Sequence, residues 1–263
     1  MSHLRKFKRL YAVIIAALVL VCALPLIPEE TAEANLITAK ITLPSKRDGS
    51  DYYAVGYQKD PTFSGKIDLG TAYNYITHVR VWISDWSGNV YKGHDTKLIS
   101  ISGKRSKINL SDYPELNQRI NFADLPCDGK LYTLWLSYKA TDSLGRSVST
   151  ISTSLKFSVE KIPTINASLT YSSIQVGKNT ALKGNVNGST TLKNISITVS
   201  KGSTTYLSFS KKLNSTTYNL GVQEVKNALN FSKLTTGYYT IKITVTDKNN
   251  LSASKSLGLS IER

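Results

Sequence analysis

The residues that could carry out catalysis are few in this sequence and stand far apart. After residue 34 there is one cysteine, Cys127, and there are two histidines, His78 and His94. The histidines lack the His-x-x-x-His spacing of metal ligands, and no histidine or acid forms a nucleophile motif with the cysteine. A nucleophile elbow and a phosphate-binding loop are also missing from the sequence. The sequence therefore predicts a protein that is not an enzyme and that holds no metal and no cofactor.

Binding chemistry is better represented than catalytic chemistry. The three tryptophans of the chain are Trp82, Trp86 and Trp135. Flat aromatic rings that reach solvent stack on sugar rings or anchor a protein partner. Their use depends on which elements carry them and on which way each side chain is turned.

Alternation of apolar and polar residues dominates the chain and predicts strands. Every second residue is apolar in residues 79–83, 132–140, 195–199 and 239–245. This period of two is typical of a strand with one buried face and one solvent face. Turn residues such as Ser87-Gly88-Asn89 separate the runs, so many short strands are expected.

The order of motifs occurs twice along the chain. An Asn-Phe pair (121–122 and 230–231) precedes a run that begins with Tyr and ends with Asp (132–142 and 239–247). Short helical turns are predicted before the two pairs, within residues 112–119 and 222–229. Two copies of about 100 residues with roughly seven short strands each are typical of immunoglobulin-like sandwiches. The predicted fold class is all-β, with two tandem immunoglobulin-like β-sandwich domains after an N-terminal signal peptide.

Some polar residues of the repeat have a predicted structural role. Tyr132 and Tyr239 stand near the start of the penultimate strand of each copy, where a buried ring returns its hydroxyl to nearby backbone as a tyrosine corner. Asp142 and Asp247 stand at strand ends before turns, where a carboxylate bonds the amides of its own turn. We therefore expect these four residues to stabilise the fold.

One surface of the first copy is a predicted binding face. Because Val79, Val81 and Ile83 point inward, the residues between them point outward, and the same holds for the strand of 132–140. In an immunoglobulin-like sandwich these two strands are neighbours, so Trp82 and Trp135 are expected side by side. The alternative is that the residues before Ala54, or the second domain, cover these rings. The candidate ligand-binding residues are His78, Arg80, Trp82, Trp86, Trp135 and Lys139.

The second copy resembles a known family. In residues 230–247, a strand and turn lead to Gly237-Tyr238-Tyr239, alternating aliphatic residues and a closing Asp247. This pattern resembles the late strands of bacterial Ig-like domains and extends over residues 165–262. It is looser over residues 65–158, where Gly129-Lys130-Leu131-Tyr132 replaces Gly-x-Tyr. The resemblance implies a secreted protein of the Gram-positive cell envelope, where such domains often accompany cell-wall hydrolases, and it implies no catalytic residue.

The N-terminal segment has the order of a secretory signal. Basic residues are followed by an apolar run at 10–27 and by Ala32-Glu33-Ala34, which predicts cleavage before Asn35. An uncleaved anchor is the alternative, and it is the only contact with a membrane that we expect. The predicted domains are therefore the signal peptide 1–34, a tryptophan-bearing domain 35–160 and a strongly basic domain 161–263, with the boundary at Glu160-Lys161-Ile162-Pro163.

Charge differs sharply between the two predicted domains. Residues 35–160 hold 16 Lys or Arg against 12 Asp or Glu, and residues 161–263 hold 13 against 3. An excess of lysine either makes a surface soluble or attracts a polyanion such as wall teichoic acid, anionic lipid or extracellular DNA. Lysine supplies point charge without bidentate geometry, so we expect no specific recognition of nucleic acid.

These observations together predict a non-enzymatic, secreted or cell-surface binding or adhesion module. Its expected partner is an anionic cell-wall polymer or a glycan, and its expected location is extracellular and associated with the cell envelope. A structural spacer or accessory subunit that binds another envelope protein is the first alternative. An enzyme of unrecognised type is the second.

Overall fold

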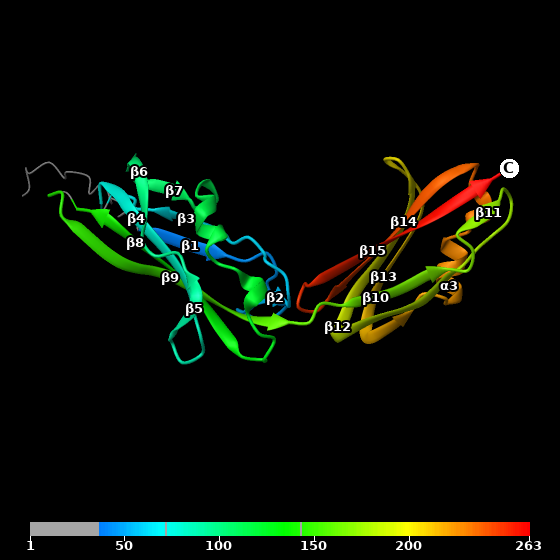
Figure 1. Cartoon of the computed structure of the whole chain (residues 1–263), viewed down its shortest axis with the longest axis horizontal. Coiled ribbons are helices and arrows are strands. Elements are labelled where there is room, and N and C mark those ends of the chain that lie inside the picture. The colour runs from blue at the N-terminus through cyan, green and yellow to red at the C-terminus, as the bar shows by residue number, and fades with distance from the viewer. Residues whose placement is uncertain (1–36, 72, 143) are drawn as a thin grey trace, which may run out of the picture.

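A computed structural model of the chain describes residues 37–71, 73–142 and 144–263. The predicted signal peptide and its cleavage site before Asn35 lie outside these residues. The described residues form two groups of β-strands that follow one another along the chain and lie end to end (Figure 1). None of the described helices is long and apolar enough to cross a membrane.

The first group of strands forms two layers. One layer has the order β1-β3-β7, with all pairs antiparallel. The other has the order β2-β9-β8-β4-β5, and β6 also pairs with β4; only β2 and β9 run parallel. The strands are β1 (Thr38–Thr42), β2 (Tyr53–Gly56), β3 (Ser64–Asp68), β4 (Tyr75–Ser84), β5 (Val90–Asp95), β6 (Ile99–Arg105), β7 (Lys107–Asn109), β8 (Leu131–Thr141) and β9 (Ser147–Glu160).

The second group has the same layers, although two of its strands pass from one layer to the other. Residues 182–187 of β12 pair with β10, whereas residues 192–200 pair with β14. β13 accompanies β12 along both parts, and β15 continues the second layer to the parallel strand β11. The strands are β10 (Thr164–Leu169), β11 (Ser173–Gln175), β12 (Leu182–Lys201), β13 (Thr204–Asn219), β14 (Gly237–Asp247) and β15 (Ser252–Glu262).

Short helical turns close each sandwich. They are η1 (Leu110–Asp112), α2 (Pro114–Gln118), η2 (Phe122–Asp124), α3 (Gln223–Ala228) and η3 (Phe231–Lys233). The turns predicted within residues 112–119 and 222–229 are confirmed by α2 and α3, whereas η2 and η3, at the Asn-Phe pairs, were not predicted. Asn121 Oδ1 accepts from Ala123 N at 3.1 Å, and Asn230 Oδ1 accepts from Ser232 N at 3.2 Å. Phe122 and Phe231, which follow these asparagines, are buried in their own cores. Both Asn-Phe pairs therefore begin a short turn with the same asparagine cap and a buried phenylalanine.

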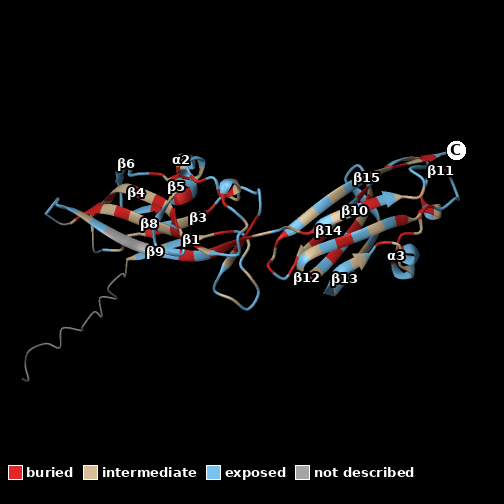
Figure 2. Ribbon diagram, turned by 60° about the horizontal axis from the view of Figure 1, so that its bottom comes forward, coloured by how far each residue is buried: buried red, intermediate tan, exposed pale blue. Residues whose placement is uncertain are grey.

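Each group of strands encloses its own hydrophobic core. The buried residues of the first core run from Ile41 to Val159, and those of the second run from Ala167 to Ile261. Figure 2 shows the buried positions along the strands of both bodies, with exposed positions between them. The predicted inward faces are confirmed, and so is the predicted fold of two tandem immunoglobulin-like β-sandwiches.

The predicted roles of the tyrosines and aspartates are largely confirmed. Tyr239 Oη donates to Thr235 O at 3.0 Å, as a tyrosine corner requires. The hydroxyl of Tyr132 instead approaches a side-chain oxygen, Asp128 Oδ1, at 3.4 Å. Asp142 and Asp247 each accept two amide hydrogen bonds from their own turns, at 2.8 to 3.0 Å.

Candidate ligand-binding face and domain junction

The predicted pairing of the two tryptophans is confirmed. β4 and β8 are hydrogen-bonded neighbours in the middle of their sheet, and Trp82 is the register partner of Trp135. Their ring centroids are 5.9 Å apart and their planes differ by 9°, so the rings are stacked. Val81 and Leu134, on the opposite face of the same strands, are fully buried. Burial of the inner face therefore places the rings on the outer one, where both are half-buried.

Each ring is held by a specific partner. Trp135 Nε1 donates a hydrogen bond of 2.8 Å to Oγ of the buried Ser84. The guanidinium carbon of Arg80 lies 4.7 Å from the centre of the Trp82 ring, within the range of a cation–π interaction. Rings fixed in this way lose little conformational freedom when a ligand binds.

Asp95 on β5 fixes the guanidinium of Arg80. Arg80 Nε donates to Asp95 Oδ1 at 2.9 Å and Arg80 Nη2 donates to Asp95 Oδ2 at 2.8 Å, which is bidentate geometry. Lys97 adds its backbone amide at 2.9 Å and its ammonium at 2.8 Å. The hydrogen bonds from Arg80, then those from Lys97, hold the pKa of the Asp95 carboxyl well below its usual range. We name Arg80, Trp82, Asp95 and Trp135 the aromatic stack.

The order of strands decides which ring surface is open. β5 and β8 flank β4 on opposite sides, so the guanidinium drawn toward Asp95 and the ring of Trp135 cover opposite faces of Trp82. The remaining face of Trp135 is turned toward β9, where its register partner is the exposed Ser154. No other ring or cation stacks on Trp135 within the described residues. Within the stacked pair, one ring face is therefore left uncovered by another ring or a cation of the described residues.

The other candidate residues lie apart from the stack. His78 and Lys139 are register partners on the same outer face, four residues along their strands from Trp82 and Trp135. His78 Nδ1 is buried without a hydrogen-bond partner. Trp86 stands in the turn after β4, is 70% exposed and has no ring contact among the described residues. The side-chain hydrogen bond and ring contacts of Trp82 and Trp135 come from β4 and β8, not from the residues before Ala54 or from the second domain.

Two residues of this site could not be found from alternation. Asp95 faces Trp82 only because the β4–β5 register shifts between Trp82 and Ser84, whose own partner is Val90. Ser84 is buried at the strand end, where the pattern predicts a polar turn residue. The negative charge of Asp95 is the feature by which it could have been predicted, since an outward arginine on one strand favours a carboxylate on the neighbouring strand.

The two domains are joined by polar contacts, which we name the clasp. Arg47 Nε donates to Asn249 Oδ1 at 3.1 Å, and Lys193 Nζ lies 2.7 Å from Asp48 Oδ2. Asn250 Nδ2 donates to Asp48 Oδ1 at 3.0 Å. Hydrogen bonding to Lys193, then to Asn250, lowers the pKa of the Asp48 carboxyl. Because side chains of both domains take part, the clasp restrains the angle between them.

Comparison with known proteins identifies no family. No family model matches the chain, and no curated protein matches it. Among solved structures, it is similar to the fibronectin(III)-like modules of Clostridium thermocellum CbhA, at 11% identity and a TM-score of 0.37, over 85% of this chain and 94% of that one. Dimeric latent PorU from Porphyromonas gingivalis shares 12% identity at a TM-score of 0.26, over 86% of this chain and 24% of its own. Likeness at this level carries no function from either protein to this one.

Proposed function

We propose that this chain is a non-enzymatic protein of the cell surface that binds glycan or wall polymer through its first domain. The observation that supports this function is the aromatic stack on the outer face of a β-sandwich. One indole face of Trp135 is open, and small hydroxyl residues surround it, since Ser154 is its register partner and Thr133 and Ser137 precede and follow it by two residues on β8. A pyranose ring stacks on such a face while its hydroxyl groups bond to neighbouring polar side chains.

The second domain adds electrostatic attraction for an anionic polymer without a defined arrangement of binding groups. Among its 13 Lys or Arg, only Lys193 and Lys211 form ion pairs within the described residues. The unpaired ammonium groups raise the local concentration of a polyanion, and salt weakens this attraction because it acts across water. An anionic wall polymer therefore fits the second domain, as a glycan fits the first.

The test is a pull-down of residues 35–263 on purified Gram-positive walls, with and without teichoic acid, across a series of salt concentrations. We expect binding that weakens with salt and that falls about tenfold in Trp135→Ala, because Trp135 offers the open ring. Tyr171→Ala is the matched control, since Tyr171 is an exposed aromatic residue of the second domain. Unchanged binding of Trp135→Ala to every wall preparation and to soluble wall glycans would sink the proposal.

A structural spacer is the second candidate function, and the clasp favours it. A restrained junction keeps two domains at a fixed separation, which suits a protein that presents its far end to another envelope protein. Absence of binding to any wall preparation, together with capture of one surface protein that Trp135→Ala abolishes, would favour this candidate over wall binding.

A further inference from the structure

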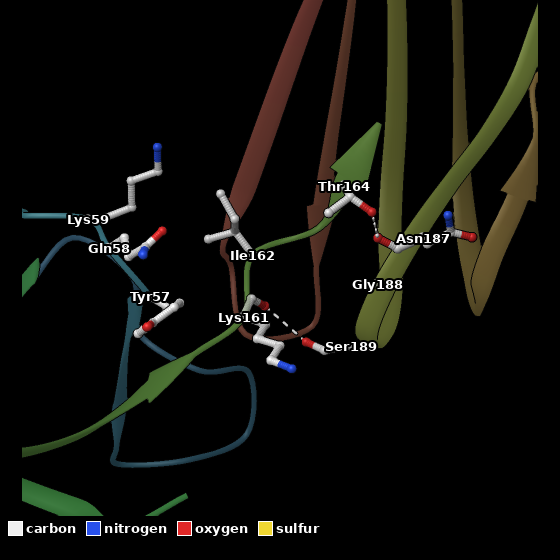
Figure 3. A pocket seen from close by; sticks show the side chains of 9 residues that line it. All are labelled: Tyr57, Gln58, Lys59, Lys161, Ile162, Thr164, Asn187, Gly188 and Ser189. Atoms are coloured by element: carbon white, nitrogen blue, oxygen red, sulfur yellow. Dashed lines mark hydrogen bonds between the residues drawn. The ribbon is translucent and has the colours of Figure 1, made fainter. Parts of the chain in front are cut away.

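A cleft opens where the two domains meet. It has a volume of about 470 Å³ and is lined by three segments of the chain, which Figure 3 shows around Ile162. Residues 57–59 follow β2 in the first domain, residues 161–164 connect the domains, and residues 187–189 belong to β12 in the second domain. The cleft shares no lining residue with the clasp.

Hydrogen bonds tie each wall of the cleft to Glu160 and Lys161, where β9 ends and the connecting segment begins. Ser189 Oγ donates to Lys161 O at 2.9 Å, and Tyr57 N donates to Glu160 O at 2.7 Å. Ile162 packs against Gly56 so closely that a Cβ atom on this glycine would lie 2.6 Å from Ile162 Cγ2. Together with the clasp, these contacts form the cleft before any ligand arrives, which lowers the entropy lost on binding.

Four polar side chains of the cleft have no partner in the described part of the chain. Within the described residues, the ammonium groups of Lys59 and Lys161 form no hydrogen bond or ion pair, and the side-chain amides of Gln58 and Asn187 form none either. No carboxylate lines the cleft. The nearby Glu160 carboxylate accepts from Ser158 Oγ at 2.8 Å and lies 3.6 Å from Arg47 Nη1. The cleft therefore has unopposed positive charge.

The directions of the two lysines indicate the kind of anion. In Figure 3, Lys59 and Lys161 extend away from each other on either side of Ile162. Two ammonium groups that diverge do not enclose one phosphate, but they can each meet a different phosphate of a chain. Tyr57 and Ile162 add apolar surface between them, against which the carbon backbone of a polyol packs.

We propose that this cleft is a binding site for a linear polyol chain joined by phosphodiester groups, crossing the junction with separate phosphates on Lys59 and Lys161. The proposal rests on the proposed function and gives its anionic polymer a defined site. It moves the recognition of charge from the whole lysine-rich surface of the second domain to the boundary between the domains.

The experiment compares two double variants of residues 35–263 with the same net charge. Lys59→Ala with Lys161→Ala removes the lysines of the cleft. Lys178→Ala with Lys226→Ala removes exposed, unpaired lysines near β11 and on α3, at the end of the second domain far from the first (Figure 1). Binding of soluble poly(glycerol phosphate) is measured by calorimetric titration at several salt concentrations, with monomeric glycerol phosphate as a second probe.

We expect the cleft variant to bind the polymer about tenfold more weakly, with a shallower dependence of affinity on salt, and the control variant to change by less than about twofold. The amide signals of residues 57–59 and 187–189 should shift in nuclear magnetic resonance spectra when the polymer is added. The monomer should bind far more weakly than the polymer.

Other outcomes overturn the proposal in different ways. Equal weakening of both variants would mean diffuse attraction, which removes the cleft site but leaves the proposed function intact. A monomer that binds as tightly as the polymer would exclude the chain-crossing arrangement. If the unmodified protein binds no poly(glycerol phosphate) at low salt, both this site and the electrostatic part of the proposed function fail.

Discussion

The two domains have corresponding central strands but differ in the residues on the outer face of those strands. Across the outer face of the first domain, the register places Asp95, Trp82, Trp135 and Ser154 in one row. The matching row of the second domain is Ser208, Thr198, Lys242 and Ser256. Beside the two central positions of each row, the inward residues are buried aliphatics in both domains: Val81, Ile83, Leu134 and Leu136 in the first, and Ile197, Val199, Ile241 and Ile243 in the second. Burial of the inward residues therefore specifies the same fold in both domains. The core does not constrain the outer row, which is aromatic in the first domain and polar in the second.

The corresponding aspartates of the two domains also differ. Asp142 and Asp247 cap equivalent turns with the same pattern of amide hydrogen bonds. Hydrogen bonds from the amide and side chain of Arg146 outweigh burial and lower the pKa of Asp142, whereas burial is the largest effect on Asp247 and raises its pKa. The pKa values of the two carboxyls thus shift in opposite directions within the same local motif, because Asp247 is fully buried and Asp142 is partly exposed.

Glycines at equivalent places give the largest expected loss of stability. Gly65 and Gly184 both have positive φ, at 157° and 107°, and an added Cβ would collide with the backbone oxygen of Lys40 or of Asn166. We expect Gly65→Ala and Gly184→Ala each to lower the free energy of unfolding of its own domain by about 2–4 kcal/mol. Calorimetry measures both transitions, and tryptophan fluorescence follows the first domain alone because all three tryptophans lie there. Equal loss in both domains from either variant would contradict independent cores.

Asp95→Asn tests the ion pair that exists only in the first domain. Removal of this charge leaves Arg80 without its carboxylate partner, so the free energy of unfolding of the first domain should fall by about 2 kcal/mol at neutral pH. The folded-state pKa of Asp95 is held below its ordinary value of 3.8, so its stabilisation is present above that pH and is lost as the pH falls below it.

Denaturant titrations followed by tryptophan fluorescence at several pH values measure this effect. The gap between the unmodified protein and Asp95→Asn should narrow below pH 3.8. A gap that stays constant through acid would show that the charge of Asp95 does not act through the Arg80 pair.

Exchange of the two tryptophans of the outer row separates the effect of the surface on binding from the effect of the core on stability. Trp82→Thr with Trp135→Lys gives the first domain the residues of the second at the corresponding positions. We expect about a tenfold loss of affinity for wall material, with the stability of the first domain changed by only about 1 kcal/mol, since the inner face is untouched. Wall binding by the pull-down assay and calorimetry measure the two effects. Unfolding of the first domain in this double variant would mean that the aromatic stack is needed for the stability of the fold.

The tyrosine corners give the smallest expected difference. Tyr239→Phe removes a hydrogen bond of 3.0 Å to backbone, and Tyr132→Phe removes a longer one of 3.4 Å to a carboxylate. We expect a loss of about 1 kcal/mol for Tyr239→Phe and less for Tyr132→Phe. Calorimetry of the two variants measures which one loses more stability. A larger loss in Tyr132→Phe would show that the hydrogen bond to Asp128 contributes more free energy than its length indicates.

The central strands β4, β8, β9, β12 and β14, their inward faces, the helical turns before each Asn-Phe pair and the capping by Asp142 and Asp247 could be predicted from the amino-acid sequence. These features depend on periodicity and on contacts between residues close in the chain, so local chemistry is enough to predict them. The strand order of the sandwich also indicated that Trp82 and Trp135 lie close together on one outer face, and the register of the structure pairs them.

How those side chains are used depends on contacts between distant parts of the chain. The shift of register that brings Asp95 to Trp82 comes from an irregular hairpin, and no alternation of residue types encodes its length. Arg47 and Asn249 meet across 202 residues of chain, and the cleft forms from three separate segments. Such contacts depend on how completed domains dock, whereas the pattern along each strand reports only which face is buried.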